Sequence, residues 1–277
     1  MRLFSLSVTA ALLSLGCGNG NTVVAPPAET KSEKSEPRIE TNKGAERWGT
    51  VTGRLTWGEK ELPAAAKLVV NKDEMQCLRK GPIYGERYVV NKANKGVANV
   101  FVWLLDATDP AHPKAPPIHP SLKEAREKEV VIDQPCCKFE PHAVALREGQ
   151  VLIAKNSSDI LHNFDWVGGE GQSENRLVPA RGQITIDVLE ASQKPFSVQC
   201  AVHPWMSAYF RVFDHPYFAV TDGDGKFEMK HAPAGKYNIV MWHEGMGWIQ
   251  GVKTGRAIDV KAGGITEADG EVVPAKE

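Results

Sequence analysis

Apolar residues follow a short-period pattern through most of the chain. From Trp48 onward, short runs rich in Val, Ile, Thr and aromatic side chains are separated by Gly, Pro, Asn and Asp. Runs of this kind predict β-strands. The predicted strands cover residues 49–57, 67–70, 98–105, 130–132, 142–146, 150–156, 183–188, 196–198, 209–213, 218–221, 226–229, 236–243 and 256–260. We therefore expect an all-β protein, and 277 residues leave room for two β-sandwiches.

One segment breaks the pattern. Residues 120–129 read PSLKEAREKE, which predicts a charged surface helix after a Pro-rich loop at residues 108–120. The last residues, 263–277, contain few large apolar side chains and are expected to form a flexible tail.

The first residues have the pattern of an export signal. Met1 and Arg2 precede an apolar run from Leu3 to Leu15 that is too short to span a bilayer as a stable helix. The end of this run resembles a bacterial lipobox, which implies cleavage before Cys17 and lipidation of its thiol. Ser14 stands where the lipobox consensus has Leu, so an ordinary cleaved signal with an incidental cysteine is the alternative.

These features predict where the protein is located. Residues 1–16 are expected to be a lipoprotein-type signal peptide, and residues 17–47 are too polar to form a core, which predicts a disordered tether. We expect an exported protein of the periplasm or cell envelope. Attachment to the membrane would be through the N-terminal lipid alone.

Four glycine-containing motifs lie in two separated parts of the chain: G-T-V-T-G at 49–53, G-V-A-N-V at 96–100, T-D-G-D-G-K-F-E at 221–228 and P-A-G-K-Y at 233–237. In this order they resemble the carboxypeptidase regulatory-like domain, a transthyretin-like β-sandwich without catalysis of its own. The resemblance implies that residues 48–108 and 216–262 form one sandwich. Residues 109–215 would form a second domain, either inserted into the first or placed in sequence after it.

Four residues of the second domain form a possible metal-ligand set. Cys200, His203 and Met206 lie on one short connection between two predicted strands, and His162 follows an earlier strand. Two imidazoles, one thiolate and a thioether are the ligands of an electron-transfer copper site. Zinc is the main alternative, but structural zinc sites use Cys and His without Met.

The same motifs resemble those of cupredoxins, the plastocyanin- and amicyanin-like blue-copper proteins with a Greek-key fold. The matches are D-x-x-H-N at 159–163 and C-x2-H-P-x-M at 200–206. The resemblance implies one type 1 copper bound by His162, Cys200 and His203, with Met206 as the axial ligand. It also implies that Asn163 ties the two ligand loops together.

The resemblance further implies a route for electrons. In this family the second histidine, here His203, surfaces through an apolar patch. Pro204 and Trp205 would form this electron port, with Tyr209 nearby; ordinary loop packing is the alternative.

The other cysteines allow a disulfide, because exported proteins fold in an oxidising compartment. If Cys200 binds copper, Cys77 with Cys137 is the first choice, and a bridge between adjacent Cys136 and Cys137 would be strained. A thiol relay of metal by Cys136 and Cys137 is an alternative. His142 is expected to be a strand residue, or else a further ligand or modulator of the site.

Charge and motifs exclude several functions. With 33 basic and 34 acidic residues, the chain shows no sign of nucleic-acid binding. The His-x-His pairs of multicopper oxidases are absent, and four protein ligands leave no open position for a substrate, so no enzymatic activity is expected. The expected function is single-electron transfer between envelope redox proteins. The alternatives are copper carriage or storage, and a non-redox envelope scaffold or adhesion module.

Overall fold

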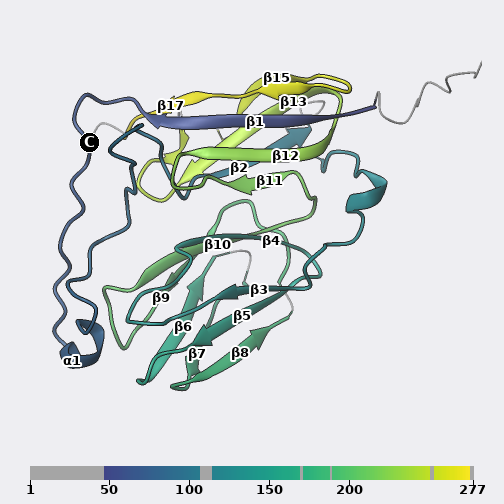
Figure 1. The fold of residues 1–277 in the computed structure, drawn as a ribbon. Helices are drawn as coiled ribbons and strands as arrows, with labels where there is room; N and C mark the ends of the chain where they lie inside the picture. Colours follow the sequence, from purple (N-terminus) through teal and green to yellow (C-terminus); the bar gives the residue numbers. More distant parts are fainter. Residues whose placement is uncertain (1–46, 107–113, 169–170, 188, 250–252, 275–277) are drawn as a thin grey trace, which may run out of the picture. The chain divides into compact units, whose positions relative to one another are not determined.

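The computed structural model describes residues 47–106, 114–168, 171–187, 189–249 and 253–274. Strands dominate this part of the chain, which confirms the all-β class (Figure 1). The predicted signal peptide, Cys17 and almost all of the predicted tether lie outside the described residues. No helix among the described residues is long and apolar enough to cross a membrane.

One pair of sheets uses strands from both ends of the chain, and we call it the terminal sandwich. Its core contains side chains of both sheets. The first sheet contains β1 (Trp48–Trp57), β12 (Lys226–Pro233), β16 (Ile265–Glu267) and β17 (Gly270–Val272). The second contains β2 (Phe101–Asp106), β11 (Phe218–Val220), β13 (Gly235–His243), β14 (Gly247–Trp248) and β15 (Arg256–Val260).

The other pair of sheets, which we call the central sandwich, is formed by the middle of the chain. Its five-stranded sheet contains β4 (Ala143–Arg147), β6 (His162–Val167), β7 (Glu174–Val178), β9 (Phe196–Gln199) and β10 (Ser207–Phe213). Its three-stranded sheet contains β3 (Glu129–Ile132), β5 (Val151–Asn156) and β8 (Gly182–Ile186). A second core joins these two sheets.

The central sandwich is inserted into the terminal one. Strands β2 and β11 lie on either side of it in the sequence, yet they pair directly with each other in one antiparallel ladder. Of the two arrangements that the sequence allowed, the structure therefore has the insertion. The family of the terminal sandwich stays a prediction.

Strand β2 explains how the two sandwiches are joined. Alternate side chains of a strand point to opposite faces, and in β2 both faces are buried. Val102 and Leu104 enter the core of the terminal sandwich. Phe101 and Trp103 enter a third cluster with Phe213 of β10, from the central sandwich. A half-exposed strand would alternate apolar and polar residues, whereas β2 is apolar at five successive positions and buried at the first four.

The predicted helix at 120–129 is wrong. Only a single 3-10 turn, Pro120–Leu122, forms there. The guanidinium of Arg147 donates to the carbonyl oxygens of Leu122 and Lys123, at 2.6 and 3.2 Å. These carbonyls would otherwise accept the next helical hydrogen bonds, so a tertiary contact ends the turn.

The predicted flexible tail is also wrong over most of its length. Strands β16 and β17 pair in parallel with β1, and β17 (yellow) lies beside β1 (purple) in Figure 1. Ala268 and Val272 are buried in the core of the terminal sandwich. Only every second residue of this segment faces inward, so its apolar content is low although it completes a sheet.

A long connection between β1 and β2 departs from the predicted domain boundary. Part of it, residues 66–86, packs against the core of the central sandwich through Leu68, Val70, Cys77, Leu78 and Ile83. We call residues 66–86 the cover segment. It contains one short helix, α1 (Glu74–Cys77), that the sequence did not predict.

Candidate metal centre

The β-ladder of the central sandwich brings the predicted ligands together. Gln199 of β9 pairs with Ser207 of β10, so the connection that carries Cys200, His203 and Met206 is short. Gln199 also pairs with Asp165 of β6. The next position along this antiparallel ladder, residue 164 of β6, lies opposite Cys200. His162 is two residues before position 164, so the two positions share one face of the sheet.

Hydrogen bonds of a buried amide shape the loop before His162. The side-chain nitrogen of Asn156 donates to the carbonyl oxygens of Ile160 and Val178, at 2.9 and 3.0 Å. Its side-chain oxygen accepts from the backbone N–H of Ser158 at 3.1 Å. Asn156 has no exposed surface, so these bonds hold the loop and His162 in one position.

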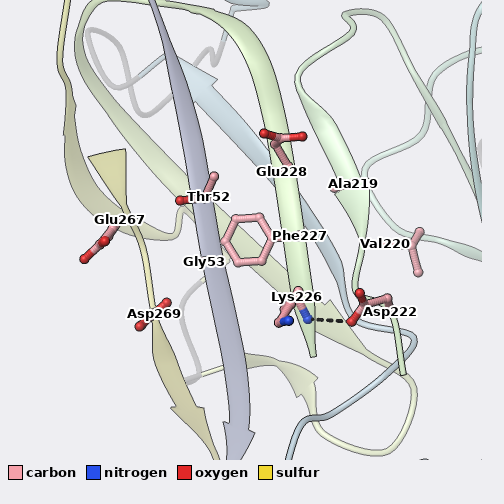
Figure 2. Close-up of a pocket in the computed structure, with 10 residues that line it drawn as sticks. All are labelled: Thr52, Gly53, Ala219, Val220, Asp222, Lys226, Phe227, Glu228, Glu267 and Asp269. Carbon is pink, nitrogen blue, oxygen red and sulfur yellow. Dashed lines mark hydrogen bonds between the residues drawn. The ribbon is translucent and has the colours of Figure 1, made fainter. Parts of the chain in front are cut away.

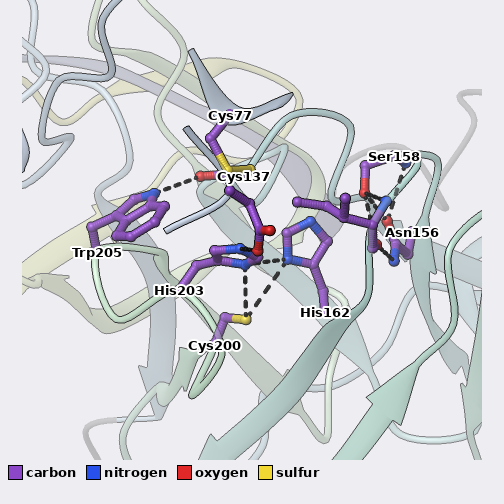
Figure 3. Close-up of a disulfide and its surroundings, with 10 residues drawn as sticks. Cys77, Cys137, Asn156, Ser158, His162, Cys200, His203 and Trp205 are labelled. Atoms are coloured by element: carbon purple, nitrogen blue, oxygen red, sulfur yellow. Dashed lines mark hydrogen bonds and ion pairs between the residues drawn. A yellow bond between two sulfur atoms is a disulfide. The ribbon is translucent and has the colours of Figure 1, made fainter. Parts of the chain in front are cut away.

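Three donor atoms face one another at the centre (Figure 3). The Sγ atom of Cys200 lies 3.8 Å from Nδ1 of His162 and 3.9 Å from Nδ1 of His203, and the two Nδ1 atoms are 2.9 Å apart. A metal ion roughly 2.0–2.3 Å from nitrogen and sulfur ligands keeps such atoms about 3–4 Å apart. The three side chains therefore fit around one ion.

Met206 completes the loop next to these residues. It is 2 % exposed and belongs to the same core. Its backbone N–H donates to the carbonyl oxygen of His203 at 2.9 Å, and its own carbonyl accepts from the N–H of Cys200 at 3.4 Å. The thioether is thus part of the buried loop, and its role as axial ligand stays a prediction.

The pKa values of both candidate histidine ligands are lowered. Burial, together with the charge of His203, lowers the pKa of His162 to about 4, against a smaller opposing effect of Asp73. Burial also lowers the pKa of His203, and here too Asp73 acts in the opposite direction. Near neutral pH both imidazoles are therefore neutral, which is the form that binds a metal.

Asn163 connects the two ligand segments, in the place where the sequence analysis expected it. Its Oδ1 atom lies 3.2 Å from Sγ of Cys200 and accepts a hydrogen bond of 3.2 Å from the backbone N–H of Val202. Its amide nitrogen donates to Oδ1 of Asn175 at 2.8 Å. One side chain therefore spans from β6 to the loop after β9.

The predicted exposure of His203 is wrong. Its side chain has no exposed surface, and its Nε2 atom lies 2.9 Å from Oδ2 of Asp73 in the cover segment. Trp205 is half-buried, and its ring nitrogen donates to the carbonyl oxygen of Cys137 at 3.2 Å. The cover segment thus occupies the place where an exposed histidine edge was expected, and sequence reasoning missed Asp73.

The predicted disulfide between Cys77 and Cys137 is present, with Cα atoms 5.2 Å apart (Figure 3). The two sulfurs and a ring nitrogen of His203 lie within 4.8 Å of one another. Both cysteines are buried, whereas the free thiol of Cys136 is half-buried. Among the sequence features, only this predicted disulfide indicated that the segment around Cys77 lies beside the central sandwich.

His142 has other partners than a metal. Its Nε2 atom is hydrogen-bonded to Oε1 of Glu244, and its Nδ1 atom lies 3.7 Å from a carboxylate oxygen of Glu86. It belongs to neither of the groups of possible metal ligands among the described residues. The structure thus gives His142 a place among polar contacts with Glu244 of the terminal sandwich and Glu86 of the cover segment.

A hollow of about 540 Å³ on the terminal sandwich is lined by other residue types than the candidate metal centre (Figure 2). Its acidic residues are Asp222, Glu228, Glu267 and Asp269, and Asp222 accepts a hydrogen bond from the backbone N–H of Lys226 at 2.8 Å. The lining contains no imidazole or sulfur, so it does not contribute to the metal centre.

Comparison with known proteins gives similarity to solved structures alone. No protein-family model and no curated protein matches the chain. A reduced tryptophan-to-tyrosine mutant of amicyanin is 19% identical, with a TM-score of 0.28 over 32% of this chain and 87% of that chain. The reduced Cu(I) form at pH 4 of a proline-to-glycine mutant of amicyanin is 16% identical, with a TM-score of 0.28 over 40% of this chain and 98% of that chain. We therefore base the assignment of the centre on this chain's own residues.

Proposed function

We propose that this protein is an exported cupredoxin-type electron carrier with one type 1 copper. The observation that carries the proposal is the triangle of His162 Nδ1, Cys200 Sγ and His203 Nδ1, in which each pair of atoms is 2.9–3.9 Å apart. The soft thiolate and the two imidazoles together suit copper in both oxidation states. Copper would supply a one-electron couple at this position.

The protein's own residues would keep the site constant while the electron moves. The β6–β9–β10 ladder fixes the two ligand segments, and Asn163 links them. All four predicted ligands are buried, with at most 2 % of their surface exposed. A rigid, water-excluding site would need little rearrangement on oxidation or reduction, which favours fast transfer.

The proposed location is the cell envelope, where the partners would be redox proteins. This part of the proposal rests on the export signal and the Cys17 lipobox in the sequence. It is tested by expressing the full chain in a bacterium and measuring the mass of the mature N-terminus. A diacylglycerol-modified Cys17 that is lost in Cys17→Ser supports a lipid anchor, and an unmodified N-terminus contradicts it.

The optical spectrum of the chain from Trp48 onward, loaded with Cu(II), tests the electron carrier. A visible thiolate-to-copper charge-transfer band that a mild reductant bleaches supports the proposal. The band should disappear in Cys200→Ser and persist in the matched control Cys136→Ser. A protein that binds Cu(I) but forms no coloured Cu(II) state would indicate copper carriage instead, and a protein that prefers zinc would contradict both.

A further inference from the structure

The outer edge of His203 has a partner from a distant part of the sequence. Nδ1 of this ring faces Cys200 and His162, whereas Nε2 lies 2.9 Å from Oδ2 of Asp73, 130 residues earlier. Because Nδ1 would be a metal ligand, the ring carries its proton on Nε2 and donates it to the carboxylate. A carboxylate in this position orients a ligand histidine and raises its basicity.

The position of Asp73 is fixed by the backbone on either side of it. Its φ angle of 49° lies in the left-handed region, which Asp tolerates better than most residues. Its carbonyl oxygen accepts hydrogen bonds from the N–H groups of Gln76 and Cys77, at 3.0 and 2.9 Å. This turn ends at Cys77, which is covalently bonded to Cys137 of the central sandwich.

Apolar packing holds the rest of the cover segment. Ile83 is 6 % exposed, and Leu68 and Leu78 pack against the core that contains Phe164 and Met206. The segment folds back on itself through hydrogen bonds of Leu68 N–H to Ile83 O and of Gly85 N–H to Ala66 O, at 2.9 and 2.8 Å. The cover segment is therefore a packed, hydrogen-bonded part of the domain.

Solvent reaches the centre only as far as Asp73 on this side. The His203 side chain is 0 % exposed, whereas the side chain of Asp73 is 38 % exposed. The Nε2 edge of His203 is thus covered by a partly exposed carboxylate. The cupredoxin resemblance instead implied an exposed His203 edge within an apolar patch.

We propose that Asp73 is a positioning residue for the metal centre and that the disulfide-held cover segment seals it. This inference rests on the proposed function and deepens it. The Asp73 carboxylate holds His203 through Nε2–H and favours the Cu(II) state by its charge, and the Cys77–Cys137 bond keeps the carboxylate in place. Electron exchange on this side then passes through the Asp73–His203 hydrogen bond.

The midpoint potential of the copper-loaded protein tests the role of the charge. Asp73→Asn keeps a hydrogen-bond acceptor of the same shape but removes the negative charge, so the potential should rise. Glu74→Gln is the matched control, because it removes the same charge from the next residue of the cover segment and should leave the potential almost unchanged. Equal potentials of wild type and Asp73→Asn, or equal shifts in both variants, would overturn the inference.

The affinity for copper and its rate of loss test whether the disulfide-held cover segment seals the metal centre. The variant with Cys77→Ser and Cys137→Ser should lose copper to a chelator faster and bind it about tenfold or more weakly, as for other groups that support a metal ligand. Cys136→Ser should behave like the wild type. An unchanged rate of copper loss in the double variant would contradict a sealing role.

A measurement without copper separates this inference from the proposed function. In the metal-free protein, NMR should show a slowly exchanging His203 ring proton on Nε2 that disappears in Asp73→Ala. If the wild type gives no blue copper centre, the proposed function fails, whereas this proton still reports the contact. If the wild type is blue and the proton and potential do not respond to Asp73, only the inference fails.

Discussion

Oδ1 of Asn163 accepts a hydrogen bond from the backbone N–H of Val202, with 3.2 Å between the two atoms. The bond joins strand β6, which begins with His162, to the loop between β9 and β10, which carries the other predicted ligands. The side chain of Asn163 is 2 % exposed. Buried bonds of this kind are costly to break, because the remaining N–H is left without a partner.

We expect Asn163→Ala to lower the free energy of unfolding of the metal-free protein by about 1–3 kcal/mol. It should also speed the loss of bound copper, since the two ligand segments are no longer linked. Urea unfolding and chelator competition measure the two effects. Asn175→Ala is the control, because the Asn175 side chain accepts a hydrogen bond from the amide nitrogen of Asn163, whereas the bond to Val202 uses the amide oxygen; a larger effect of Asn175→Ala would contradict this account.

The His142–Glu244 pair should couple the two sandwiches. His142 precedes β4 in the central sandwich, and Glu244 follows β13 in the terminal one; their side chains are only 4 % and 10 % exposed. A double-mutant cycle with His142→Ala and Glu244→Ala should give a coupling energy of about 1–3 kcal/mol in urea unfolding. Strictly additive effects would show that the contact contributes nothing.

Arg211 is buried between aromatic rings, with its Cζ atom 3.8 Å from the Trp103 ring centroid and 4.3 Å from that of Phe213. Burial lowers its pKa to about 9, and its Nη1 atom has no hydrogen-bond partner among the described residues. Taking a charged group out of water is costly, and an apolar side chain of similar size avoids that cost. Arg211→Met should therefore change the free energy of unfolding by less than about 1 kcal/mol.

Arg211→Ala is the contrasting variant. It leaves a cavity beside Trp103 and should destabilise the protein by about 2–4 kcal/mol. If Arg211→Met were as destabilising as Arg211→Ala in urea unfolding, the stacked charge would itself be needed for stability.

His215 should make stability depend on pH. Burial, followed by the charges of Arg211 and Arg147, lowers its pKa to about 3 from an ordinary value of 6.5. Between these pH values the unfolded chain binds a proton that the folded protein does not. The free energy of unfolding therefore falls as the pH falls from about 6.5 to about 3, by about 1.4 kcal/mol per pH unit for this residue.

His215→Asn should make that pH dependence shallower while leaving an acceptor for the N–H of Tyr217, which now lies 3.1 Å from His215 Nδ1. Urea unfolding at several pH values measures the slope. His231→Asn, at an exposed position, controls for the removal of one imidazole. An equal slope in wild type and His215→Asn would contradict the buried, neutral state of His215.

The C-terminal strands should be needed for the terminal sandwich. A chain that ends at Gly263 loses β16 and β17, including Val272, which has no exposed surface. It also loses the bond from Ala268 N–H to Thr52 O, of 2.8 Å. We expect a loss of about 2–4 kcal/mol in unfolding free energy and aggregation through the uncovered edge of β1. A chain that ends at Pro274 is the control and should match the full-length protein.

The candidate ligand set could be predicted from the sequence because it is mostly local. Cys200, His203 and Met206 are carried by one short connection, and a hairpin fixes their relation once β9 and β10 pair. His162 required one further step, which was the pairing of its strand with the same hairpin. The period-2 pattern of the strands, as in β1 with every second residue buried, likewise determined the all-β class.

The surroundings of that set were decided by the tertiary structure. Asp73 is 130 residues away from His203. A single aspartate in a polar stretch of sequence does not indicate such a contact. In the same way, nothing local marks Val272 as a core residue, because its strand exists only by pairing with β1 at the other end of the chain. The sequence by itself determined the candidate ligands, since their chemistry is that of a copper site and three of the four lie on one short connection. Only long-range packing decided what covers them, because that depends on contacts between segments whose own patterns are weak.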